Sequence, residues 1–301
     1  MDIQSTDELM RAEYPPVRWA VDGLVPEGVT VFAAPWKAGK SRVILDCLIG
    51  VTTGTEALGS LRCEPGPALY IALEDGPRRA QDRMRMTRGD RPEPVELHWA
   101  YDLAAVDKGG LGDVEDWLTD HPDARMVVID VLGKVRGEIR QTYQRDYALM
   151  GMFKRLSEDH GNVSIVLVTH TNKHIDRDDP TSSIQGSKGI VGAADAILMM
   201  LRDRGSDVAT LLMTGKDVPE QEVPLQLRKD GRWAVTRETA EHRGVMGARG
   251  KVLDALNDGI QSGPKLSMAT GLTEDHVRQI LHRMHKCGQV RKNEAGNYVA
   301  A

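Results

Sequence analysis

The chain has 301 residues, of which 41% are hydrophobic, and its formal net charge is −5. This length allows one large core and a small second domain, and the acidic balance argues against a protein coated in positive charge for indiscriminate nucleic-acid binding. No run of about 18 apolar residues occurs, and the N-terminus MDIQSTDELM resembles neither a signal peptide nor a transit sequence. We therefore expect a cytoplasmic protein without a membrane segment.

Three cysteines, Cys47, Cys63 and Cys287, are scattered along the chain. Their spacing fits neither metal ligation nor a disulfide framework, which favours reduced thiols with structural roles. The first 28 residues are mostly polar and contain three prolines, so we interpret them as a lead-in to the first core strand.

The first predicted strand, residues 29–32, is followed by the loop APWKAGKS at residues 34–41 and by a helical pattern. Strand, Gly-Lys-Ser loop and helix are the parts of a P-loop, whose backbone N–H groups hold nucleotide phosphates. Gly39 allows the tight turn, Lys40 is expected to reach the β- and γ-phosphates, and Ser41 is expected to ligate Mg²⁺. The residues expected to contact ATP are Ala34, Pro35, Trp36, Lys37, Ala38, Gly39, Lys40, Ser41 and Arg42.

This loop departs from the usual motif at its first position, where Ala34 stands in place of glycine, and Trp36 and Lys37 make it bulkier. A chance Gly-Lys-Ser turn is the competing interpretation. The strand before the loop, the helix after it and the motifs downstream favour the P-loop. ATP and Mg²⁺ are therefore the predicted cofactors.

Two further apolar runs end in acidic residues. Residues 68–73 predict a buried strand followed by Glu74, and residues 125–130 predict another that closes on Asp130. Because ligands gather at the carboxyl ends of strands in α/β sheets, Glu74 is expected to polarise the attacking water. Asp130 is expected to order the Mg²⁺ shell. A solvated acid at a strand end is the alternative for Glu74.

The remaining segments of this region predict scaffold and one more polar strand end. Residues 77–91 are helical and rich in arginine, which we interpret as a solvated or subunit-facing surface rather than a DNA groove. Residues 143–160 predict a helix that covers the sheet. The apolar strand at 164–169 leads to His170, which is expected to touch the γ-phosphate, although lone histidines are more often structural.

The order of these motifs resembles the RecA-like ATPases, and within them the plasmid RepA-type and DnaB-type hexameric replicative helicases. The likeness runs from about residue 29 to residue 227 and rests on APWKAGKS, Glu74, Asp130, the THTNK segment at 169–173, Gly186-Ser187 and AADAI at 193–197. It implies an α/β fold, a RecA-like P-loop NTPase core with a mainly parallel sheet flanked by helices. In that family the glutamate at the position of Glu74 is the catalytic base, and an aspartate aligns with Asp195.

The resemblance also implies a basic finger that a neighbouring subunit places against the γ-phosphate, where it stabilises transition-state charge. Lys216 is our candidate, with Arg202 and Arg204 behind it, and a plain salt-bridged lysine is the alternative. A finger acting in trans requires a ring or filament, so the resemblance implies a homo-oligomer such as a hexameric ring.

The C-terminal part resembles a winged helix-turn-helix, with three short helices followed by two short strands. The predicted division of the chain is a lead-in (1–28), an ATPase domain (29–236), a linker (237–249) and a winged-helix domain (250–301). From residue 251 onward there are seven Lys/Arg and five Asp/Glu, so this domain is more basic than the whole chain. Candidates for DNA contact are Arg278, His282, Arg283, Arg291 and Lys292. A winged helix that binds protein is the alternative.

The sequence as a whole predicts an ATP-hydrolysing motor that acts on DNA, in the form of a RepA-like replicative helicase with replication or recombination proteins as partners. Two alternatives stay open. One is a RecA-like recombination or loading ATPase that does not unwind DNA. The other is a DNA-binding regulator whose nucleotide state gates the winged helix.

Overall fold

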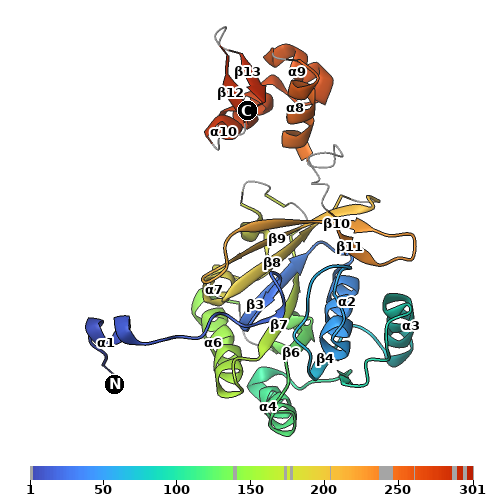
Figure 1. Ribbon diagram of the computed structural model, residues 1–301, viewed down its shortest axis with the longest axis vertical. Helices are drawn as coiled ribbons and strands as arrows, with labels where there is room; N and C mark the ends of the chain where they lie inside the picture. The colour runs from blue at the N-terminus through green and yellow to red at the C-terminus, as the bar shows by residue number, and fades with distance from the viewer. Residues whose placement is uncertain are drawn as a thin grey trace.

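The larger unit of the protein is a layered α/β structure with helices on both faces of a nine-stranded sheet (Figure 1). The computed structural model describes residues 3–137, 141–172, 175–176, 179–203, 205–236, 247–260, 262–286, 290–293 and 297–300, without the side chains of 247–250, 276, 279, 283, 286 and 300. Within these residues, no helix is both long and apolar enough to cross a membrane. The predicted fold class, a mainly parallel sheet flanked by helices, is confirmed.

The strand order in the sheet is β11-β10-β9-β8-β3-β7-β6-β4-β5. The strands from β8 to β5 are parallel to their neighbours, and β9, β10 and β11 extend the sheet antiparallel beyond β8. Their bounds are β3 Gly28–Ala34, β4 Ala68–Ala72, β5 Leu97–Ala100, β6 Met126–Asp130, β7 Ser164–His170, β8 Ala196–Leu201, β9 Val208–Gly215, β10 Gln221–Leu227 and β11 Trp233–Val235.

Each face of the sheet carries its own apolar cluster, because side chains alternate along every strand. In β3, Phe32 and Ala34 join the cluster on the α2 side, whereas Val31 and Ala33 join the cluster on the α6 side. A strand buried on both faces has a continuous apolar sequence, which is why the strand at residues 29–32 could be predicted. The helical elements are α2 Lys40–Thr53 and α3 Pro77–Arg88 on one side, and η1 Val106–Lys108, α4 Gly110–Asp120, α5 Leu132–Val135, α6 Tyr143–Asp159, η2 Pro180–Ser183 and α7 Lys188–Ala193.

The cluster on the α2 side also contains two of the three cysteines. Cys47 and Cys63 are buried there as free thiols, and burial raises the pKa of Cys63 to about 11. Cys287 lies outside the described residues. The two described thiols therefore agree with the predicted structural role.

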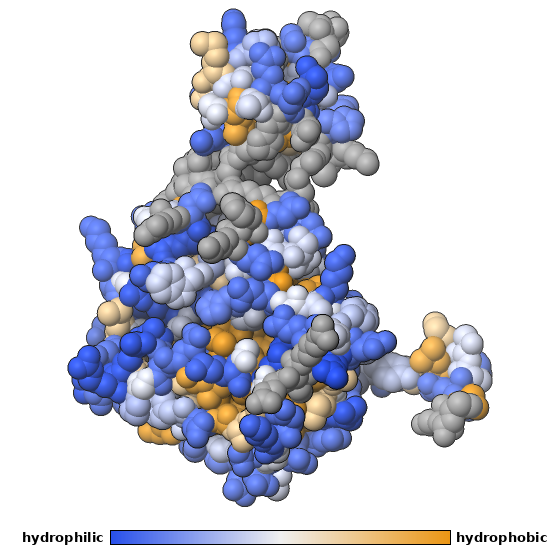
Figure 2. Space-filling view, turned by 180° about the vertical axis from the view of Figure 1, so that it is seen from behind, coloured by the Kyte–Doolittle hydropathy of each residue, from blue (hydrophilic) through white to orange (hydrophobic). Residues whose placement is uncertain are grey.

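The core begins earlier than the predicted start of the ATPase domain at residue 29. Strands β1 (Trp19–Val21) and β2 (Val25–Pro26) pair with each other, and Val21 and Leu24 are fully buried in the α2-side cluster. This hairpin was missed because its strands are very short. Helix α1 (Thr6–Arg11) has no buried residue and stands off the body, with apolar side chains exposed on it (Figures 1 and 2).

The C-terminal part forms a second small core of its own. It contains α8 Gly247–Asn257, α9 Gly263–Thr270, α10 Glu274–Lys286, β12 Val290–Lys292 and β13 Tyr298–Ala300, with the last two paired antiparallel. The buried residues of this core are Val252, Ala255, Leu256, Leu266, Val277, Ile280, Leu281, Met284 and Val290. The predicted linker stays a prediction, since residues 237–246 lie outside the described part of the chain.

Candidate active site

The loop between β3 and α2 has the backbone geometry of a phosphate cradle. Gly39 adopts φ +115° at the N-cap of α2, and a Cβ atom there would lie 2.8 Å from Nε1 of Trp233. Both the left-handed backbone and the close indole therefore require glycine at this position. The first amide groups of α2 face the loop at the positive end of the helix dipole, which favours an anion.

Lys40 is buried at the start of α2, where it bridges two neighbouring strands. Its Nζ donates to the carbonyl oxygen of Ala34 at 3.2 Å and lies 2.9 Å from Nδ1 of His170. Burial lowers the pKa of Lys40, and the carboxylates of Asp130 and Glu74 oppose that shift. A phosphate group would supply the negative charge that this buried ammonium group lacks.

Ser41 and Asp130 form a pair of oxygen donors beside this lysine. The hydroxyl of Ser41 donates to Oδ2 of Asp130 at 3.4 Å, and the hydroxyl of Tyr70 donates to the same oxygen at 2.8 Å. Burial raises the pKa of Asp130, while the bond from Tyr70 and the charge of Lys40 lower it. A hydroxyl and a carboxylate are the hard oxygen ligands that Mg²⁺ prefers, so this donor set fits the predicted cation.

Glu74 and His170 are the remaining predicted residues of the site, and they are more exposed to solvent than Lys40 and Asp130. Oε2 of Glu74 lies 3.9 Å from Nε2 of His170, and the Glu74 side chain is 50% exposed. Burial and the charge of Lys40 lower the pKa of His170, and Glu74 opposes them. A half-exposed carboxylate beside a buried lysine is suitably placed to meet water.

Parallel strands bring these five predicted residues together. In the order β3-β7-β6-β4 the carboxyl ends of the four strands meet at one edge of the sheet. Lys40 and Ser41 follow β3, His170 ends β7, and Asp130 ends β6. Glu74 follows β4 by two residues. The geometry of a site at this edge was therefore predictable from the strand ends alone.

Two side-chain contacts at or beside the loop were not predicted from the sequence. Arg202, which follows β8, donates from Nη1 to the carbonyl oxygen of Ala38 at 3.1 Å, and its guanidinium lies 4.9 Å from the ring centroid of Trp233. Arg42 donates to the carbonyl oxygen of Gly231 at 3.3 Å. The reserve finger candidate Arg202 thus contacts the loop of its own chain. Arg204 lies outside the described residues.

The loop also carries two exposed side chains, Trp36 and Lys37. Trp36 is 75% exposed, and Nζ of Lys37 lies 4.2 Å from its ring centroid. Lys37 adopts φ +64°, the left-handed backbone that few residues other than glycine adopt. Pro35 connects Trp36 to the end of β3, and Ala38 connects Lys37 to Gly39.

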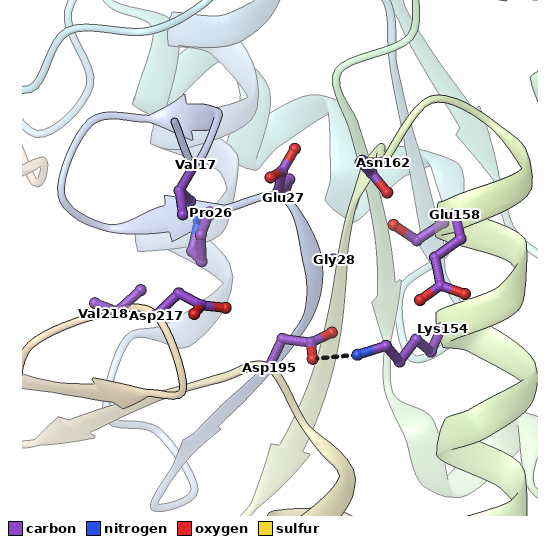
Figure 3. Close-up of a pocket in the computed structure, with 11 residues that line it drawn as sticks. Val17, Pro26, Glu27, Gly28, Lys154, Glu158, Asn162, Asp195, Asp217 and Val218 are labelled. Carbon is purple, nitrogen blue, oxygen red and sulfur yellow. Dashed lines mark hydrogen bonds and ion pairs between the residues drawn. The ribbon is translucent and has the colours of Figure 1, made fainter. Parts of the chain in front are cut away.

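Lys216 lies at the amino-terminal end of the parallel strands, whereas Lys40 lies at their carboxyl-terminal end. Nζ of Lys216 is 3.2 Å from Oδ1 of Asp195, which also accepts a bond from Lys154 at 2.8 Å (Figure 3). Oδ2 of Asp195 accepts a hydrogen bond from the amide of Val29, which is the second residue of β3. The P-loop follows Ala34, the last residue of the same strand. Burial raises the pKa of Asp195, but its bonds to Lys154, Val29 and Lys216 outweigh burial and hold the pKa below its usual range.

This position separates Lys216 from the loop of its own chain. The six residues from Val29 to Ala34 span about 17 Å of strand. The Lys216 side chain is half exposed, and its partner Asp195 lines a pocket of about 140 Å³ (Figure 3). The pocket is lined by residues that include Glu27, Glu158 and Asp217. The structure does not bring Lys216 to the other predicted catalytic residues of the same chain.

The predicted DNA-contact residues lie in the C-terminal unit. Arg278 and His282 are exposed on α10, and Arg291 and Lys292 are exposed on β12. Arg278 pairs loosely with Asp275 at 3.6 Å. The side chain of Arg283 lies outside the described part of the chain.

Comparison with known proteins supports this arrangement. A family model described as an AAA domain matches residues 2–176, which is more than half of the chain. The chain belongs to the AAA domain family. None of the curated proteins compared with this AAA domain protein matches it.

A solved structure described as "The Structure Of A DnaB-Like Replicative Helicase And Its Interactions With Primase" has a similar fold, with a TM-score of 0.56 and 14% sequence identity. The match covers 76% of this chain and 66% of that one, so the AAA domain protein spans slightly less than two thirds of the helicase. The predicted resemblance to RecA-like P-loop ATPases of the DnaB type is confirmed at the level of family and fold.

Proposed function

We propose that this chain is a Mg²⁺-dependent ATPase that acts on DNA as a replicative helicase of the RepA and DnaB type. The observation that carries the proposal is the gathering of a buried lysine, a hydroxyl, two carboxylates and a histidine at one sheet edge beside a glycine N-cap. These residues are Lys40, Ser41, Asp130, Glu74 and His170. Membership of the AAA domain family supports ATP as the nucleotide.

The amide groups at the start of α2 and the ammonium group of Lys40 would bind the β- and γ-phosphates. Lys40 would exchange its contacts with Ala34 and His170 for phosphate oxygens. Ser41 and Asp130 would hold Mg²⁺, which supplies neutralisation of the phosphate charge when bound. The remaining residues of the loop, from Ala34 to Arg42, would wrap the nucleotide.

Glu74 is the proposed general base. Its carboxylate would take a proton from water as the water oxygen bonds to the γ-phosphorus, and the bond to the bridging oxygen would break to release ADP. His170 lies between Glu74 and Lys40, which supports our proposal that it touches the γ-phosphate and responds to its loss.

We further propose that active sites are shared between subunits of a homo-oligomer, in the form of a hexameric ring. Lys216 lies at the sheet edge opposite to its own P-loop, so a role as a finger requires the nucleotide of a neighbouring subunit. In this assembly the ion pair with Asp195 would hold the lysine before it reaches that nucleotide.

The C-terminal unit is the proposed DNA-binding domain. Its three helices and two-stranded sheet support a winged helix-turn-helix over residues 250–301, joined by the linker 237–249 to the ATPase domain. The exposed basic residues of α10 and β12 would contact base edges and phosphates. The similar helicase is described with primase, and a replication or recombination protein is the partner that we propose here.

Steady-state ATP hydrolysis by the purified chain with Mg²⁺ tests this function, measured alone and with single-stranded or double-stranded DNA over a range of protein concentrations. Stimulation by single-stranded DNA that steepens with protein concentration, together with strand displacement, is the expected result. Stimulation without displacement would favour a loading or recombination ATPase. No hydrolysis under any of these conditions would contradict the proposal and leave a nucleotide-gated DNA-binding regulator.

A further inference from the structure

A tyrosine hydroxyl is buried inside the sheet next to the carboxylate that ends β6. Tyr70 is 2% exposed, and its hydroxyl donates to Oδ2 of Asp130 at 2.8 Å. Tyr70 lies opposite Val128 in the parallel pairing of β4 with β6, and Val128 and Asp130 point to the same face of the sheet. The Tyr70 side chain therefore extends past Val128, its partner in β6, to Asp130, two residues further along that strand.

The ring that carries this hydroxyl is held on its other side. Tyr70 lies opposite Trp99 in the pairing of β4 with β5, and the two ring centroids are 4.9 Å apart. Tyr70 belongs to the apolar cluster on the α2 side, and Trp99 packs against that cluster. This packing fixes the hydroxyl within the sheet, which is how a rigid element positions a functional group.

Packing alone does not account for tyrosine at this position. A phenylalanine would fill the same space, whereas a buried hydroxyl costs free energy unless it is hydrogen-bonded. Within the described residues, the hydrogen-bond partner of the Tyr70 hydroxyl is the Asp130 carboxylate. The hydroxyl is therefore tied to the orientation of one carboxylate.

The carboxylate that it meets is constrained at a single oxygen. Oδ2 of Asp130 accepts both the Tyr70 and the Ser41 hydroxyl, and Asp130 is 6% exposed. Within the described part of the chain, Oδ1 has no hydrogen bond. Two donors on one oxygen fix the plane of the carboxylate and leave the other oxygen for a further ligand.

We propose that Tyr70 is a positioning residue for the divalent cation: its hydroxyl holds the Asp130 carboxylate in the orientation that binds the hydrated metal of the nucleotide complex. The proposal rests on the proposed function of the site. Tyr70 contacts neither nucleotide nor metal in this role, and it acts through Asp130. Hydrogen-bond partners of metal ligands typically change metal affinity by about 10- to 100-fold when they are removed.

The test compares metal-dependent and metal-free nucleotide binding by the full chain. A fluorescent ATP analogue is titrated into wild type, Tyr70→Phe and the matched control Tyr101→Phe, first in EDTA and then with increasing Mg²⁺. Mn²⁺ binding to the nucleotide complex is followed by electron paramagnetic resonance. Tyr101 is exposed and stacks on Trp99 with the ring centroids 6.2 Å apart, so its substitution perturbs the same aromatic group.

For Tyr70→Phe we expect binding in EDTA within about twofold of wild type, because Lys40 and the α2 amides are untouched. The apparent affinity for Mg²⁺ and Mn²⁺ should weaken by about 10- to 100-fold, while Tyr101→Phe should match wild type. Normal binding in EDTA also verifies that the variant is folded. Unchanged metal affinity in Tyr70→Phe would overturn the proposal.

A double-mutant cycle shows whether Tyr70 works through Asp130. In an Asp130→Asn background, adding Tyr70→Phe should change metal affinity by less than about twofold. An equal loss in both backgrounds would mean that Tyr70 acts elsewhere and would overturn the proposal. Wild-type chain that binds neither the analogue nor Mn²⁺ would overturn the proposed function itself, which separates the two failures.

Discussion

Nζ of Lys40 lies 2.9 Å from Nδ1 of His170, which joins the helix start after β3 to the last residue of β7. A protonated lysine can only donate, so Nδ1 must accept and the ring proton must be on Nε2, on the side of Glu74. The contact therefore favours the neutral imidazole. It also places one ring between the proposed phosphate-binding lysine and the proposed base.

This contact predicts how stability depends on pH. Burial and the charge of Lys40 lower the pKa of His170 below its ordinary value of 6.5, with Glu74 and Asp130 opposing the shift. Between the lowered pKa and 6.5 the unfolded chain binds more protons than the folded chain. The contribution of His170 is therefore fully present above pH 6.5 and is lost as pH falls through the lowered pKa.

His170→Gln should remove this part of the pH dependence. Urea unfolding at a series of pH values from neutrality downward should show a smaller loss of free energy of unfolding in the variant than in wild type. His160→Gln, at the end of α6, controls for the substitution itself. Parallel curves for wild type and His170→Gln would mean that the histidine is not held neutral by its neighbours.

Glu74→Gln tests the proposed base. Glutamine keeps the shape of the side chain but cannot accept the proton of water, so turnover should fall by about 10²- to 10⁴-fold. ATP affinity should change little, because Lys40 and the helix start remain. Steady-state hydrolysis and equilibrium nucleotide binding measure the two quantities, with Glu93→Gln as a control at an exposed carboxylate paired with Arg88. Near-normal turnover in Glu74→Gln would exclude this residue from the mechanism.

The site was predictable where chemistry coincides with a strand end. An apolar run followed by Glu74, Asp130 or His170 is visible in a linear sequence, and parallel neighbours then bring the ends together. The hairpin β1-β2 and the contacts of Tyr70 and Trp233 were not visible in this way. Tyr70 looks like another apolar core position, and Trp233 meets Gly39 only through the sheet order.

The order of motifs in the sequence does not by itself assign a role to Lys216. The resemblance made Lys216 a finger candidate because it directly follows β9, and the structure pairs it with Asp195 at the opposite end of the parallel strands from the P-loop. The finger role that we propose requires a contact with another subunit, whereas the salt-bridged alternative requires only Asp195 of the same chain. Mixing experiments address that contact directly.

Lys216→Ala and Lys40→Ala subunits should each be inactive alone and should recover activity when mixed. In mixed oligomers an intact P-loop from the first variant meets an intact Lys216 from the second at about a quarter of the interfaces under random assembly. ATP hydrolysis against mixing ratio measures the recovery. Lys154→Ala, which removes the other lysine that pairs with Asp195, should keep its turnover. Activity of Lys216→Ala equal to wild type would identify a structural lysine.

The buried pair of Arg136 and Asp146 predicts a large loss of stability. Nη1 of Arg136 donates to Oδ1 of Asp146 at 2.7 Å, and Oδ2 accepts the amide of Ser187 at 2.9 Å. Asp146 is fully buried and Arg136 nearly so. The carboxylate thus ties the start of α6 to the segment after α5 and to the N-cap of α7.

Asp146→Ala should lower the free energy of unfolding by about 3–5 kcal/mol, because it leaves the Arg136 guanidinium buried without its counter-ion. Urea denaturation measures the loss, and Asp7→Ala, which breaks the exposed pair with Arg11, should change it by less than about 1 kcal/mol. Replacing both partners, as in Arg136→Met with Asp146→Leu, should recover much of the loss, since no unpaired charge then remains. A double variant as unstable as Asp146→Ala would instead locate the main contribution in the bond from Asp146 to the Ser187 amide.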